Sequence, residues 1–106
     1  MDTLHGKALV TWIDAVEGGR VSGPPTGEAY QCTVVPSGQA KADHFSVEMA
    51  IAIPGAPETL VGLQFFAIDL AAAWLAVGAE FHVMEGPKRV GNGRVTEVGH
   101  TIEQKV

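Results

Sequence analysis

The chain has few cysteines, few basic residues and no long apolar run. Cys32 is the single cysteine among 106 residues, which excludes an intrachain disulfide or a multi-cysteine zinc site and favours a cytoplasmic protein. The longest apolar run covers 70–77, far short of the ~20 residues that a membrane-spanning helix needs. Asp2 stands where a secretory signal has basic residues. We therefore expect neither secretion nor membrane binding.

The scarcity of basic residues bears on the class of partner. Seven Lys and Arg against twelve Asp and Glu give a net charge of -5. A charge of this sign disfavours broad electrostatic binding to nucleic acid or to an anionic membrane, because both present phosphates. A local basic patch is compatible with this total.

Known catalytic motifs are missing as well: the sequence has no G-x-S-x-G elbow, no H-E-x-x-H pair and no EF-hand loop. His44 and His82 fall on polar faces of predicted strands, where a nearby glutamate would complete a metal or acid/base site. No ligand spacing supports such a site, so solvated histidines are favoured, and Cys32 is interpreted as a small buried hydrophobe. We expect no catalytic residue, no metal and no cofactor, and hence no enzyme; a small hydrolase or metal enzyme built on His44 or His82 is the least favoured hypothesis.

Glycine and proline, in contrast, are abundant. Thirteen Gly and six Pro predict many turns and short strands rather than a helical bundle, where Gly costs ~1 kcal/mol and Pro ~3 kcal/mol relative to Ala. With 106 residues and no linker-like tract, the chain 1–106 is expected to form one globular domain.

Alternation of apolar and polar residues predicts six strands. The pattern is clearest from His44 to Ile53, and the segment from Leu60 to Ile68 is apolar on both faces, which predicts a strand covered on two sides. The expected strands are 8–16, 30–35, 44–53, 60–68, 81–84 and 90–98. The segment 69–78 is either an N-capped helical turn or an irregular arm, and 91–93 indicates a bulge or bend. A six-stranded antiparallel barrel is the favoured fold, since closure removes edge strands, with a two-sheet sandwich as the alternative.

Three of the seven cations lie close together at the last hairpin, namely Lys88, Arg89 and Arg94. If folding brings Arg20 from another loop beside them, a phosphate or an acidic partner could dock there; the alternative is ordinary solvated charge. Trp74 and Leu75 are candidates for a hydrophobic docking contact, although a place in the core is favoured for Trp74.

Two stretches of the sequence resemble one family. Residues 17–31 contain Glu-Gly-Gly-Arg, a glycine at 27 and a glutamine at 31, and residues 78–96 follow the pattern G-x-x-F-x-x-x-E-G-x-x-x-V-G-x-G-x-V-T. Both are similar to the C-terminal, third domain of elongation factor Tu, in the same order and at corresponding ends. That domain is a six-stranded antiparallel barrel of about this length, so the resemblance implies one such barrel without the other domains of the factor.

The resemblance also implies a role in binding. In elongation factor Tu this barrel contacts the T-stem of aminoacyl-tRNA, packs on the sister domains and takes part in binding the nucleotide-exchange factor. Gln31, Glu85 and Gly86 match its tRNA-contacting glutamine and its Glu-Gly pair. The basic residue that precedes Glu-Gly in the family is Met84 here, which with the charge of -5 favours a protein partner over tRNA. GTP hydrolysis is excluded because no P-loop or guanine-reading motif is present.

The favoured hypothesis is therefore a non-catalytic binding module that docks on a protein or a translation component. Its expected partner-binding residues are Arg20, Gln31, Glu85, Gly86, Lys88, Arg89 and Arg94. Two alternatives stay open: a structural protein that self-associates, for instance as a homodimer through 70–77, and a weak binder of tRNA or other RNA.

Overall fold

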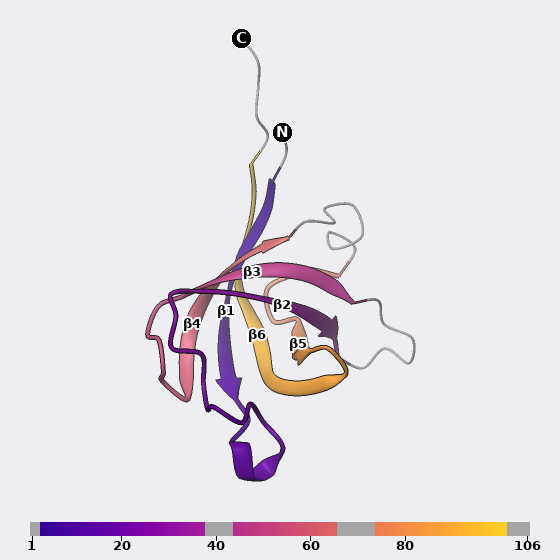
Figure 1. Cartoon of the computed structure of the whole chain (residues 1–106). Helices are drawn as coiled ribbons and strands as arrows, with labels where there is room; N and C mark the ends of the chain where they lie inside the picture. Colours follow the sequence, from indigo (N-terminus) through magenta and orange to yellow (C-terminus); the bar gives the residue numbers. More distant parts are fainter. Residues whose placement is uncertain (1–2, 38–43, 66–73, 102–106) are drawn as a thin grey trace.

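The protein is a closed antiparallel β-barrel in a computed structural model that describes residues 3–37, 44–65 and 74–101 (Figure 1). Around the barrel the strands follow the order β1-β4-β3-β2-β5-β6, and β1 pairs with β6 to close it. This confirms the six-stranded barrel and excludes the sandwich. The strands are β1 (Thr3–Trp12), β2 (Ala29–Pro36), β3 (Phe45–Ile51), β4 (Glu58–Phe65), β5 (Glu80–Glu85) and β6 (Lys88–Thr101).

The loop between β1 and β2 contains the one helical turn of the described residues, the 3-10 helix η1 (Ala15–Glu17). Within the described residues no helix is long and apolar enough to span a membrane. Strand β1 ends at Trp12 rather than at Val16, because η1 follows it. It begins at Thr3 rather than at Ala8, because β4 and β6 both pair with its first half. The predicted helical turn or arm at 69–78 lies largely outside the described residues.

Alternate side chains of each strand fill the interior of the barrel. In β3 the odd-numbered residues from Phe45 to Ile51 are buried and the residues between them are not, as the sequence predicts. In β4 the prediction of cover on both faces is wrong: Val61 and Leu63 are buried, whereas Leu60 is 51% exposed. A closed barrel has a single interior, so an outward apolar residue is left at the surface.

One end of the barrel is filled by an aromatic cluster. The ring of Trp74 lies 5.6 Å from that of Phe45, 5.8 Å from that of Phe65 and 6.3 Å from that of Phe81, centroid to centroid. Leu75 beside it is 8% exposed. Both candidates for hydrophobic docking therefore pack against the core, and little of their apolar surface is left for a partner.

Strand β6 carries two irregularities. Against β5 its register shifts so that Val83 faces Gly91 and Met84 faces Arg89, which leaves Val90 as an extra residue. Against β1 the shift lies between Lys7 and Ala8. The first irregularity adjoins the segment 91–93, where the sequence predicts a bulge.

Gly93 permits the closest packing in the strand. It faces Phe81 across β5 and β6, and a Cβ at Gly93 would lie 2.1 Å from the Phe81 ring, which is 1% exposed. The ring thus occupies the space that any other residue at 93 would need.

We predict that Gly93→Ala lowers the free energy of unfolding by about 1–3 kcal/mol, since the added methyl displaces a buried ring that has no free space to enter. Urea denaturation measures this. Gly62→Ala is the matched control: it is also a strand glycine, but its Cβ would meet the Ala50 side chain at an ordinary 3.6 Å. Equal stability of Gly93→Ala and the wild type would contradict this account of the core.

Candidate functional site

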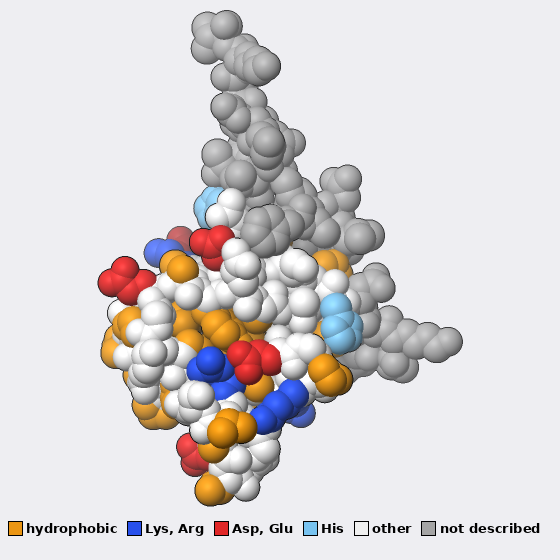
Figure 2. All heavy atoms as spheres, in the orientation of Figure 1, with side chains coloured by type: hydrophobic (Ala, Val, Ile, Leu, Met, Phe, Trp, Pro, Cys, Tyr) orange, Lys and Arg blue, Asp and Glu red, His pale blue; other side chains and the backbone are white. Residues whose placement is uncertain are grey.

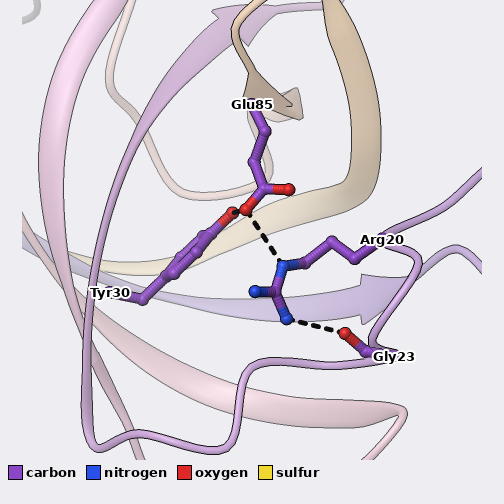
Figure 3. Close-up of polar contacts among 4 residues, drawn as sticks. All are labelled: Arg20, Gly23, Tyr30 and Glu85. Atoms are coloured by element: carbon purple, nitrogen blue, oxygen red, sulfur yellow. Dashed lines mark hydrogen bonds and ion pairs between the residues drawn. The ribbon is translucent and has the colours of Figure 1, made fainter.

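The end of the barrel opposite Trp74 is closed by a polar cluster of Arg20, Tyr30 and Glu85 (Figure 3). Arg20 Nε donates to Glu85 Oε2 at 3.0 Å, and the Tyr30 hydroxyl donates to the same oxygen. The Arg20 guanidinium also donates to the carbonyl of Gly23 at 2.7 Å and lies 5.4 Å from the centre of the Tyr30 ring. The loop after β1 and strand β2 are thus joined to the distant strand β5 at one carboxylate.

The loop after β1 is shaped to deliver Arg20. The amides of Glu17 and Gly19 both donate to the carbonyl of Asp14, which folds the loop back on itself. A Cβ at Gly19 would lie 1.7 Å from the carbonyl oxygen of Ile13, so this turn requires glycine. The Glu-Gly-Gly-Arg and Glu-Gly stretches that carry the family resemblance therefore meet in space, through Arg20 and Glu85.

The cluster holds its charges in fixed protonation states. Burial acts to raise the pKa of Glu85, but the hydrogen bonds from Tyr30 and Arg20 and the charges of Arg20 and Lys88 outweigh it and lower that pKa. Burial, the hydrogen bond to Glu85 and its charge raise the pKa of Tyr30. Burial, helped by the charge of Glu85, raises the pKa of the Cys32 thiol to about 12. Cys32 is thus a protonated thiol at neutral pH, unsuited to act as a nucleophile.

A second polar group lies on the outer face of the last hairpin. Asn92 Oδ1 accepts hydrogen bonds from Arg89, at 2.9 Å from its Nε, and it lies 3.1 Å from Nδ1 of His82. Nε2 of His82 lies 3.4 Å from the Ser37 hydroxyl. Together with Arg94 these side chains border a hollow of about 300 Å³.

The structure divides the predicted partner-binding residues into two groups. Arg89 and Arg94 line the same outer hollow, and Lys88 is exposed at the start of the same strand. Arg20 and Glu85 instead bind each other at the end of the barrel. Of the four cations expected to come together, only Arg89 and Arg94 line one hollow, and the charge of Lys88 acts on Glu85.

The remaining predicted residues lie outside both groups. Gln31 is exposed on β2 and faces Glu48 of β3. Gly86 is exposed in the turn that joins β5 to β6.

The polar residues that organise both groups were not predicted from the sequence. Tyr30, Ser37 and Asn92 carry no motif, and their partners are known only once strand register is known. The one available signal for Tyr30 was its place two residues before Cys32, which puts both side chains on the inner face of one strand. His82 was singled out, but for metal or acid/base chemistry. Within the described ranges no group of three or more His, Cys, Asp or Glu side chains is arranged to hold a metal.

Comparison with known proteins adds no assignment. No family model matches the chain, and no curated protein matches it. The site must therefore be interpreted from its own chemistry. Figure 2 shows acidic and basic side chains in small separate groups on the viewed face, among the residues it colours, rather than in one extended basic field.

We predict that Glu85→Gln destabilises the protein at pH 7, and that this difference disappears in acid. The folded-state pKa of Glu85 is lowered, so its stabilising contribution is present above the ordinary glutamate pKa of about 4.3 and is lost as the pH falls through the folded value. Thermal unfolding from pH 7 to pH 2 measures the difference. Glu97→Gln is the matched control, because the Lys7–Glu97 pair is exposed on both sides. Equal and parallel pH profiles for the two variants would contradict this role of Glu85.

Proposed function

We propose that this protein is a non-catalytic binding module, built like the third domain of elongation factor Tu, that docks on an acidic protein surface. The docking face is the outer surface of β1, β5 and β6 around Arg89 and Arg94, whereas Lys88 lies opposite Glu85 and its charge acts on that carboxylate. The observation that supports it is the contrast between two sets of cations. Lys7 and Arg20 each form an ion pair, whereas Arg89 and Arg94 form none with any described carboxylate.

Apolar side chains next to these cations favour a protein over a nucleic acid. Leu9 faces Arg94 on one side and Leu60 on the other, all three on the outside of the barrel. Leu9 is 38% exposed and Leu60 is 51% exposed. Exposed apolar residues bordered by charge are typical of protein interfaces, whereas phosphate backbones are bound by more cations than this face offers.

The two arginines without an ion pair, Arg89 and Arg94, also fit a selective rather than a general role. Charges at the border of an interface steer a partner of opposite sign and repel one of the same sign, while apolar contacts stabilise the complex. The total charge of -5 would repel most acidic partners, so only a partner that meets this face is attracted.

We predict that Arg94→Glu abolishes capture of the partner, with at least a tenfold loss, because it places a like charge against an acidic surface. Proteins captured from lysate of the native host by immobilised wild type and variant are compared by quantitative mass spectrometry at low and high salt. The matched control is Lys7→Glu, which makes the same change of charge on an exposed side chain of β1 away from the hollow. The proteins captured by the wild type should still be captured by Lys7→Glu and should be lost with Arg94→Glu.

Two results would overturn the proposal. One is the same set of proteins captured by both variants. The other is salt-sensitive binding of tRNA that both variants retain, measured by filter binding, which would favour the RNA-binding alternative.

A further inference from the structure

The outer hollow lies where β1, β5 and β6 run side by side, and its chemistry is more specific than a patch of charge. It has a volume of about 300 Å³, and its polar lining includes Ser37, Glu80, His82, Arg89, Asn92 and Arg94. Its floor includes Phe81 and Gly93, both of which are buried. A partner side chain that entered it would therefore be surrounded by polar groups from three segments of the chain.

Asn92 fixes the hydrogen-bonding roles of its neighbours. Arg89 can only donate, and both its Nε and one terminal nitrogen are directed at the same atom of Asn92, so that atom must be the carbonyl oxygen. The same oxygen accepts from His82 Nδ1, which therefore carries a proton. When the ring carries this proton alone, Nε2 accepts from the Ser37 hydroxyl, which lies 3.4 Å away.

This network leaves the hollow with spare donors. The Asn92 side-chain nitrogen and the whole Arg94 guanidinium have no hydrogen-bond partner among the described residues, and Arg89 keeps its second terminal nitrogen. The spare acceptors are the Glu80 carboxylate and the lone pairs of the Ser37 hydroxyl. A group rich in acceptors is the natural complement, because guanidinium forks bind planar or tetrahedral oxyanions.

The balance of charge selects among such groups. By formal charge at pH 7, which counts histidine as neutral, Arg89 and Arg94 contribute two positive charges and Glu80 one negative charge, so the hollow carries a single positive charge. One carboxylate neutralises it. A phosphate monoester, which carries close to two negative charges at pH 7, would leave an excess negative charge next to Glu80.

We propose that this hollow binds one carboxylate of the docking partner, with Arg94 and Arg89 as its ligands and Asn92 as the residue that positions Arg89. This inference rests on the proposed function, since it names the group by which an acidic partner is anchored. The carboxylate could belong to an acidic side chain or to a chain terminus, and both present the same two oxygens to the arginines.

The proposal is tested by NMR titration of the whole protein at low salt with three probes. N-acetylglutamate N-methylamide offers only a side-chain carboxylate, N-acetylalanine offers only a terminal one, and inorganic phosphate is the competitor. We expect one or both carboxylate probes to shift the Asn92 side-chain NH2, Arg94 Nε–H and Gly93 amide signals, and phosphate to bind more weakly. The stronger carboxylate probe identifies the source.

Substitutions separate a built site from general electrostatics. Arg94→Gln should lower the affinity for the carboxylate probe at least fivefold. Asn92→Asp should abolish binding, because it places a carboxylate in the hollow. Lys88→Ala is the matched control: it removes one charge from the same hairpin outside the hollow, so its effect should stay under twofold. The Arg94 side chain forms no hydrogen bond or ion pair with a described residue, so Arg94→Gln remains informative even if Asn92→Asp fails to fold.

The proposal is overturned if no probe shifts these signals, if phosphate binds more tightly than both carboxylates, or if Lys88→Ala and Arg94→Gln weaken binding equally. Its failure can be told apart from failure of the proposed function. Partner capture that is lost with Arg94→Glu while no carboxylate binds leaves the docking module standing and removes the anchor. Carboxylate binding without selective partner capture leaves the carboxylate site standing and removes the docking module.

Discussion

The pairing of β1 with both β4 and β6 is the constraint on which the rest of the structure depends. It gives every strand two neighbours and leaves the barrel with one interior, which must be filled at both ends. One end is filled by Trp74 and its aromatic neighbours, and the other by Arg20, Tyr30 and Glu85. The interior and both ends are therefore occupied by the protein's own side chains.

The fold was largely predictable because strand periodicity is a local signal. The alternation in 44–53 gives the inward face of β3 correctly. The exposure of Leu60 on the outer face of β4 was not predictable. An apolar residue at this position is buried in a sheet covered on both sides and exposed in a closed barrel, and the local sequence is the same in both cases. Which of these applies is decided by strand closure, and closure depends on pairing between distant segments.

The candidate site was likewise predictable only where its residues are neighbours in sequence. The hairpin cations are neighbours in sequence, so their grouping could be predicted. Arg20 and Glu85 are 65 residues apart, and their contact depends on how the first loop folds under the barrel. Asn92 could be predicted only as part of a bend, because its bonds to His82 and Arg89 arise from pairing between β5 and β6. The protein thus uses Arg20 to hold its architecture together, binds Arg89 to Asn92 on the outer wall, and leaves Arg94 without a hydrogen-bond partner among the described residues.

The extra residue in β6, Val90, determines which side of the barrel wall Arg89 faces. In a regular strand, side chains at odd and even positions point to opposite sides, so Arg89 would lie on the opposite side from Asn92 and Arg94. Val90 is buried and unpaired with β5, and it changes the parity of the strand at that point. A one-residue insertion is therefore enough to bring Arg89 to the outer wall while Val90 and Val95 after it stay inside.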